Sequence, residues 1–93
     1  MPTSLQRQTV YYGGHVQGVG FRYTTRSIAR GHAVTGYARN LTDGRVELVV
    51  EGKSQEIDAF LREVRDRFFN QIRDERCDCQ PATGEFDGFD IRH

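Results

Sequence analysis

Hydrophobic residues recur with two different periods along this chain, and the order of these periods limits the folds that it can adopt. In residues 45–51, aliphatic side chains alternate with charged ones, which predicts a strand with one buried face and one largely exposed face. In residues 57–68, the apolar side chains fall within about 100° of a helical wheel, which predicts an amphipathic helix. The apolar residues of this helix are Ile57, Phe60, Leu61, Val64 and Phe68. Burying each of them contributes about 1.5–3 kcal/mol, so this face alone can anchor the helix.

The rest of the chain shows the same two periods in shorter segments. Asp43-Gly44 is typical of a hairpin turn, and Ser54 is a good N-cap for the helix that follows it. The predicted elements, in chain order, are a strand at 8–13, a helix at 21–30, strands at 34–39 and 45–51, the helix from Ser54, a strand at 76–80 and a short strand at 89–92. This order is β-α-β-β-α-β with a short terminal strand. It predicts an α+β fold of the ferredoxin-like type, a sandwich in which two helices cover one face of an antiparallel sheet.

Length and charge restrict the classes of protein to which the chain can belong. A length of 93 residues fits one domain, and we expect a flexible N-terminal tail over residues 1–6 and a single domain over residues 7–93. The 13 Lys and Arg residues balance the 13 Asp and Glu residues, which argues against nucleic-acid binding. No apolar run approaches the length of a membrane span, and residues 1–8 lack the apolar core of a signal peptide. We therefore expect a cytoplasmic monomer that binds neither nucleic acid nor a membrane.

Two cysteines, Cys77 and Cys79, are separated by one residue. A disulfide across so short a loop is strained, so both are predicted to be free thiols in a reducing compartment. Their spacing places them on one face of the predicted strand, where we expect them to point inward as small apolar residues. A metal pair is the less favoured alternative, because no His lies beside them in the sequence.

The segment from Gly14 to Arg22 joins the first predicted strand to the first predicted helix and has the properties of an anion site. Backbone N–H groups at a helix start are unpaired, and the helix dipole adds about half a positive charge there. Glycines allow successive N–H groups to turn around one anion, and the planar guanidinium of Arg22 is suited to bidentate phosphate contact. The nucleotide P-loop and the dinucleotide-binding fingerprint both fail on spacing. A glycine-rich turn with a solvated arginine is the alternative.

Two motifs give a more specific resemblance. The first is Gly14-x-Val16-Gln17-Gly18-Val19-x-Phe21-Arg22, and the second is Gly36-Tyr37-Ala38-Arg39-Asn40, followed by Gly44-x-Val46 and Gly52. Together they resemble the two signatures of the acylphosphatase family and span residues 14–52. One departure is Tyr12, where the family usually has Leu, Ile or Val. Tyr is larger and needs a partner for its hydroxyl group if it is buried.

The resemblance implies an enzyme that hydrolyses an acyl phosphate to a carboxylate and inorganic phosphate, with no metal and no organic cofactor. It implies that Arg22 and Asn40 are the catalytic residues, Arg22 clamping the phosphoryl oxygens and Asn40 orienting the attacking water. The predicted phosphate-binding residues are His15, Val16, Gln17, Gly18, Val19, Gly20, Phe21 and Arg22, with the cradle formed by the backbone amides from Gln17 onward. His15 is often arginine in the family, and from the residue itself a surface role without contact to phosphate is the favoured interpretation.

These residues suit the chemistry of an acyl phosphate. Its leaving group is a carboxylate, which needs no strong general acid, so the site has mainly to hold the phosphoryl group and place water in line. A neutral amide such as Asn40 avoids the repulsion that a carboxylate would meet beside a phosphate. The substrate's own phosphate oxygen is a reasonable acceptor for the proton of the water.

Two rival functions stay open from the sequence. The run from Gly18 to Tyr23 faintly resembles an aromatic RNA-binding motif, but that motif belongs on a central strand and here it starts a helix. The second rival is a domain that handles carbamoyl phosphate, like the acylphosphatase-like domain of hydrogenase-maturation carbamoyltransferases, which normally sits in a much longer chain.

Overall fold

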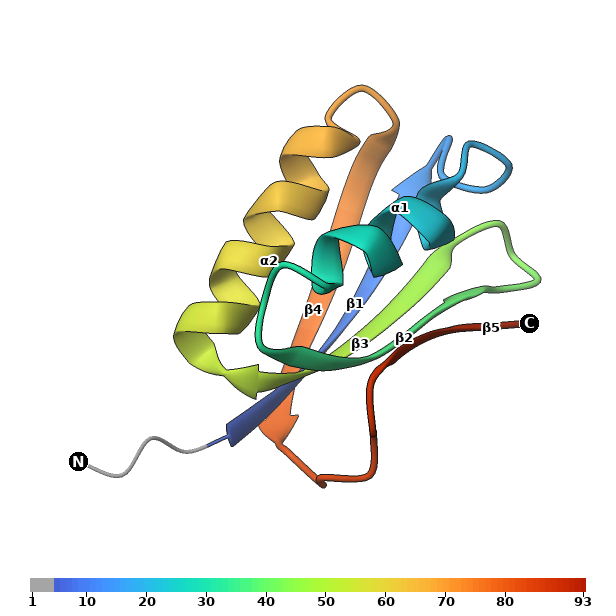
Figure 1. Ribbon diagram of the computed structural model, residues 1–93. Coiled ribbons are helices and arrows are strands. Elements are labelled where there is room, and N and C mark those ends of the chain that lie inside the picture. The colour runs from blue at the N-terminus through green and yellow to red at the C-terminus, as the bar shows by residue number, and fades with distance from the viewer. Residues whose placement is uncertain (1–4) are drawn as a thin grey trace.

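The computed structural model describes residues 5–93, which form two helices and five strands (Figure 1). The elements are β1 (Leu5–Gly14), α1 (Phe21–Ala29), β2 (Val34–Asn40), β3 (Val46–Lys53), α2 (Ser54–Arg67), β4 (Ile72–Pro81) and β5 (Phe89–Arg92). The predicted flexible tail over residues 1–6 extends two residues too far. Leu5 and Gln6 belong to β1, where they pair with Lys53 and Gly52 of β3. Residues 1–4 lie outside the described part of the chain.

The strands form one sheet in the order β4-β1-β3-β2-β5, and both helices lie on the same face of it (Figure 1). The pairs β1–β3, β1–β4 and β2–β3 are antiparallel, as expected. The terminal strand β5 pairs parallel with β2, so the sheet is mixed rather than wholly antiparallel. The α+β ferredoxin-like fold is therefore confirmed, with a correction at one edge of the sheet. Within residues 5–93, no helix is long and apolar enough to cross a membrane.

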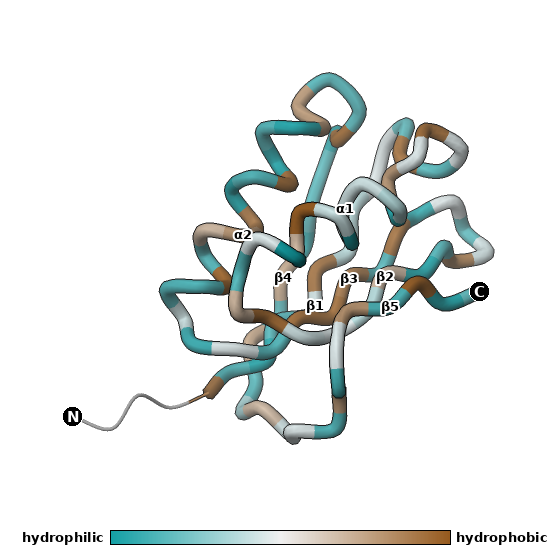
Figure 2. Tube along the Cα trace, in the orientation of Figure 1, coloured by the Kyte–Doolittle hydropathy of each residue, from teal (hydrophilic) through white to brown (hydrophobic). Residues whose placement is uncertain are grey.

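The hydrophobic core fills the space between the sheet and the two helices. All five apolar residues predicted for one face of α2 are buried, and so are Val10 and Tyr12 on β1. On α1, Phe21, Thr25 and Ala29 are buried. Figure 2 shows that β4, at the edge of the sheet, is largely hydrophilic by comparison. The core therefore lies under the inner strands and not under this edge.

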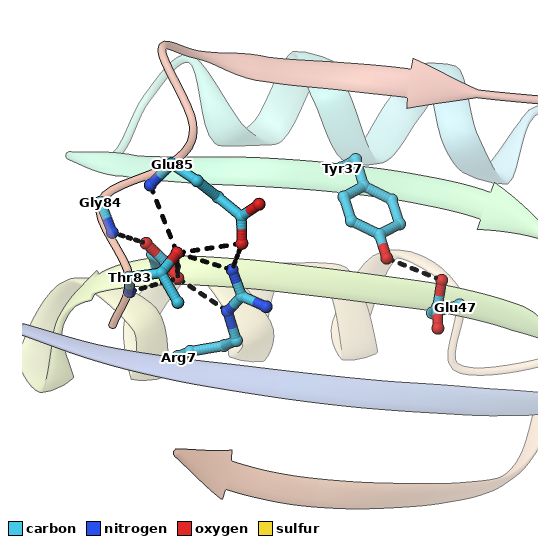
Figure 3. Close-up of polar contacts among 7 residues, drawn as sticks. Arg7, Tyr37, Glu47, Thr83, Gly84 and Glu85 are labelled. Atoms are coloured by element: carbon cyan, nitrogen blue, oxygen red, sulfur yellow. Dashed lines mark hydrogen bonds and ion pairs between the residues drawn. The ribbon is translucent and has the colours of Figure 1, made fainter. Parts of the chain in front are cut away.

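Strand β3 differs from its prediction, because both of its faces are buried. Glu47 and Glu51 were expected on an exposed face, but they are only 8% and 4% exposed. The Tyr37 hydroxyl group donates a hydrogen bond to Glu47 at 2.9 Å (Figure 3), and the Tyr11 hydroxyl group donates one at 3.2 Å. Arg39 pairs with the same carboxylate at 2.8 Å. Side chains from the two neighbouring strands thus cover this part of the central strand and satisfy the Glu47 carboxylate.

The second buried carboxylate fastens the loop over residues 82–88 to the sheet. Glu51 accepts hydrogen bonds from Arg7 Nε at 2.7 Å, from Thr83 N at 2.9 Å and Oγ1 at 3.1 Å, and from Gly84 N at 3.0 Å. Arg7 also contacts Glu85 (Figure 3). Burial by itself would raise the pKa of Glu51, but these hydrogen bonds outweigh it and hold the pKa below its ordinary value.

The 82–88 loop has to reach from one edge of the sheet to the other. Neighbouring strands lie about 4.8 Å apart, so the four spacings from β4 to β5 amount to roughly 19 Å. A seven-residue segment spans at most about 25 Å when it is extended. The loop therefore has little slack, and it crosses below the end of the sheet before it turns into β5 (Figure 1). Anchors along this path hold it in place.

Two local predictions fail for identifiable reasons. Cys77 and Cys79 are free thiols, as expected, but both are exposed. Cys77 lies opposite Val10 in the neighbouring strand, so both side chains are on the same face of the sheet. Cys77 is nevertheless exposed, because β4 is an edge strand outside the core. Ser54 is the first residue of α2 and not its cap, because β3 continues through Lys53 and runs directly into the helix.

Candidate active site

The loop between β1 and α1 begins at a bulge and ends at a left-handed glycine. The register of β1 against β4 shifts between Gly13 and Gly14, and the next N–H, that of His15, donates to Gln71 O at 2.9 Å. Gly18 and Gly20 have φ values of 79° and 77°, a backbone conformation that residues other than glycine rarely adopt. These two residues allow the loop to turn back toward the start of α1.

The start of α1 is open to an anion. Gly20 occupies the cap position, and no side chain among residues 5–93 caps the helix. The first turn of α1 contains no acidic residue. Free N–H groups and the positive end of the helix dipole therefore face the loop without a competing carboxylate in that turn.

A cavity of about 220 Å³ lies between this loop and the end of β2. It is lined by Val16, Gly18, Gly20, Phe21, Arg22, Tyr23 and Asn40. The two residues predicted to be catalytic, Arg22 and Asn40, are far apart in the sequence and meet at this one cavity. Arg22 is the only side chain of the lining that carries a permanent charge, so the cavity is suited to a small anion.

Arg22 is held by the last residues of the chain. Its Nη1 atom donates to Arg92 O at 3.2 Å and lies 3.2 Å from Nδ1 of His93. Sequence reasoning missed these neighbours, because a backbone carbonyl partner leaves no trace in the type of residue. The only available signal was the short terminal strand, whose pairing partner the sequence did not reveal.

Asn40 is the last residue of β2 and pairs with Val46 of β3. The turn that follows it is closed by Leu41 N, which donates to Arg45 O at 2.8 Å. The side chain of Gln17 reaches this turn from the β1–α1 loop and donates from Nε2 to Leu41 O at 2.8 Å and to Arg45 O at 2.9 Å. The sequence predicted only a backbone role for Gln17.

Not every predicted phosphate-binding residue lies on this cavity. The lining includes Val16, Gly18, Gly20, Phe21 and Arg22, whereas the other three residues lie outside it: His15, Gln17 and Val19. His15 lines a different hollow with Gly14 and Arg73, and Val19 packs against the edge of the core.

Two buried side chains anchor the loop to the core. Val16 is fully buried and Phe21 is 2% exposed. The Phe21 ring packs between Tyr12 and Phe68, with centroid distances of 5.2 Å and 4.4 Å. Tyr12, which departs from the family pattern, therefore serves as a packing partner of the loop, and burial raises the pKa of its hydroxyl group.

Comparison with known proteins identifies relatives over nearly the whole chain. Residues 8–91 match the family model described as Acylphosphatase. The chain is 43% identical over 88 residues to an acylphosphatase of Syntrophus aciditrophicus, which covers 94% of this chain and 92% of that protein. The crystal structure of acylphosphatase from Bacillus subtilis matches with a TM-score of 0.82 and 29% identity over 96% of this chain and 99% of the other. The HypF structure from T. kodakarensis matches with a TM-score of 0.81 and 30% identity over 94% of this chain, but only 12% of HypF is covered.

Proposed function

The chain belongs to the acylphosphatase family, and from that premise we propose that it hydrolyses acyl phosphates in the cavity between the β1–α1 loop and Asn40. The observation that carries the proposal is that Arg22 and Asn40 line one cavity at an uncapped helix start. The substrate is a small acyl phosphate, and the products are a carboxylate and inorganic phosphate.

In the proposed mechanism, the phosphoryl group binds to backbone amides within residues 17–22, of which Gly18, Gly20, Phe21 and Arg22 line the cavity. The guanidinium of Arg22 adds charge-assisted hydrogen bonds to the phosphoryl oxygens. Its Nη1 atom already contacts Arg92 O, which leaves the other guanidinium N–H groups for the substrate. Preorganised donors of this kind stabilise the charge that develops in the transition state, and losing one costs about 10²–10³ in rate.

Asn40 is proposed to orient the attacking water. Its amide group both donates and accepts hydrogen bonds, so it can hold a water molecule without adding negative charge beside the phosphoryl group. Water placed in line with the leaving carboxylate gives the effective concentration that the reaction needs. The proton of the water passes to a phosphoryl oxygen, and the bond between phosphorus and the acyl oxygen breaks.

Two substitutions test these roles in a benzoyl phosphate hydrolysis assay. Arg22→Lys keeps the charge but removes the planar fork, so kcat/KM should fall at least about 100-fold and inhibition by phosphate should weaken. Asn40→Ala should abolish turnover while phosphate still binds. Arg30→Lys, on the exposed end of the same helix, and Asn70→Ala, in an exposed turn, are the matched controls.

The outcomes separate the roles clearly. Near-normal kinetics in Arg22→Lys would remove Arg22 from the mechanism. Equal loss of phosphate binding and turnover in Asn40→Ala would make Asn40 a structural residue. Assaying carbamoyl phosphate beside benzoyl phosphate shows which acyl group the wild-type protein prefers.

We also propose that residues 7–93 act as a single-domain monomer in the cytoplasm, with no partner other than the substrate. One hydrophobic cluster contains residues of both helices and of β1, β2 and β3, and the formal net charge is zero. Light scattering after gel filtration should give a mass near 10.7 kDa, unchanged when an RNA oligonucleotide is added. A dimer mass or co-elution with RNA would contradict this proposal.

A further inference from the structure

The two halves of the candidate active site come from different parts of the chain. One half is the β1–α1 loop with Arg22, and the other half is Asn40 at the end of β2. Within the described residues, only two hydrogen bonds join the loop at residues 15–20 to the turn at residues 41–45, and both come from the side chain of Gln17.

The geometry of these two bonds uses the full donor capacity of the Gln17 amide. A primary amide nitrogen carries two hydrogens, and Nε2 of Gln17 donates to Leu41 O at 2.8 Å and to Arg45 O at 2.9 Å. Both distances are those of well-formed hydrogen bonds. The side chain is half-buried, so water competes for these bonds less than it would at an exposed site.

The two acceptors are the carbonyl groups that close the turn after Asn40. Arg45 O also accepts from Leu41 N at 2.8 Å, and Leu41 O also accepts from Gly44 N at 3.2 Å. The turn therefore stays closed when the Gln17 side chain is removed. What is lost is its attachment to the loop that holds the phosphoryl group.

We propose that the side chain of Gln17 is a positioning residue that fixes Asn40 relative to the phosphate loop. This inference rests on the proposed function, in which Asn40 orients the attacking water. Leu41 follows Asn40 directly, so a shift of the turn moves the Asn40 amide away from the line of attack. A misplacement of about 1 Å can cost about 100-fold in rate.

The decisive variant is Gln17→Met, which keeps the length of the side chain and removes both donors. We expect kcat for benzoyl phosphate to fall about 10- to 100-fold. The KM and the inhibition constant of phosphate should change less than about threefold, because the backbone amides and Arg22 still bind the phosphoryl group. Thermal unfolding followed by circular dichroism verifies that the variant is folded.

Asp43→Ala is the matched control within the same turn. Asp43 accepts from Arg45 N at 3.1 Å and from Arg45 Nε at 2.8 Å, so this variant loosens the turn without touching the link to the loop. Its kcat should stay within about twofold of the wild type. If Asp43→Ala lowers kcat as much as Gln17→Met does, general rigidity of the turn governs the rate and the inference is wrong.

The remaining outcomes separate this inference from the proposed function. If phosphate inhibition weakens in Gln17→Met as much as kcat falls, the side chain supports the cradle and not Asn40. If Asn40→Ala abolishes turnover while Gln17→Met has normal kcat, this inference fails and the proposed function stands. If Asn40→Ala itself turns over normally, the proposed role of Asn40 fails, and the positioning role of Gln17 fails with it.

Discussion

Replacing Glu51 by Gln tests how much the buried carboxylate contributes to stability. Its side chain is 4% exposed and accepts four hydrogen bonds, one of them from the guanidinium of Arg7. A hydrogen bond to a charged group contributes about 1.5–3 kcal/mol and a neutral one about 0.5–1.5 kcal/mol. The Gln amide keeps one oxygen, so the three hydrogen bonds from Arg7 and Thr83 to that oxygen become weaker. The new NH₂ group then faces the backbone N–H of Gly84, which loses its acceptor. We expect a loss of about 3–5 kcal/mol, the range for breaking a buried ion pair.

Such a loss is large for a chain of this size. A domain of 93 residues has a free energy of unfolding of about 5–14 kcal/mol. Each kcal/mol shifts the Tm of a small domain by about 4–8 °C, so Glu51→Gln should lower the Tm by at least about 12 °C. Urea unfolding followed by circular dichroism measures the change, which should shift the midpoint and leave the m-value unchanged.

The pH dependence gives a second, independent measurement. The pKa of Glu51 in the folded protein lies below its ordinary value of 4.5. A carboxyl group of this kind stabilises the fold fully above its ordinary pKa, and its contribution is lost as the pH falls through the lowered folded value. Gln does not titrate, so the difference between wild type and Glu51→Gln should be constant above about pH 6 and shrink below pH 4.5.

The control is Glu85→Gln, which alters the other carboxylate that contacts Arg7. Glu85 is 54% exposed on its side chain, so its loss should cost much less than the loss of Glu51. The reasoning is refuted if the two variants are equally stable. It is also refuted if the difference in free energy of unfolding between wild type and Glu51→Gln does not become smaller below pH 4.5.

Three further predictions concern the core, the sheet and the mechanism. Phe60→Ala removes a fully buried ring that packs on Phe89 at 5.6 Å, and urea unfolding should show a loss of about 3–5 kcal/mol; a loss under 1 kcal/mol would mean that the core repacks. Gly36→Ala places a Cβ atom 1.8 Å from Val49 O at a φ of +145°, so the variant should be largely unfolded at 37 °C by circular dichroism, and a native spectrum and Tm would contradict the close contact of β2 and β3. Dialysis against EDTA should leave benzoyl phosphate turnover unchanged, because the proposed mechanism takes its positive charge from Arg22 and the start of α1; a loss restored by Mg²⁺ would require a different mechanism.

The sequence predicted best those parts of the fold in which the pattern is local. The apolar face of α2 depends only on the spacing of five residues, and all five are buried. The charged face of β3 was misread, because charged residues ordinarily indicate solvent exposure. The residues that satisfy Glu51 come from far along the chain, Arg7 on β1 and Thr83 after β4. No local pattern contains that information.

In the candidate active site, too, some features could be predicted from the sequence and others could not. The roles of Arg22 and Asn40 were implied by the resemblance of two motifs to the acylphosphatase signatures, and both residues line one cavity in the structure. The link from Gln17 and the contact of Arg22 with Arg92 O were not predicted, because each ends on backbone carbonyl groups. Any residue in those positions offers the same acceptor, so only the three-dimensional arrangement reveals them.

The parallel direction of β5 explains how the end of the chain reaches Arg22. In the parallel register, Arg92 lies beside Arg39, next to Asn40 at the cavity end of the sheet. An antiparallel β5 would instead place Arg92 beside the start of β2, at the opposite end of the sheet. Since β4 ends at that opposite end, the chain can enter β5 in the parallel direction only by crossing the full width of the sheet there. The 82–88 loop that makes this crossing is the segment that Glu51 and Arg7 hold, so the buried carboxylate of β3 supports the path that brings Arg92 O to the guanidinium of Arg22.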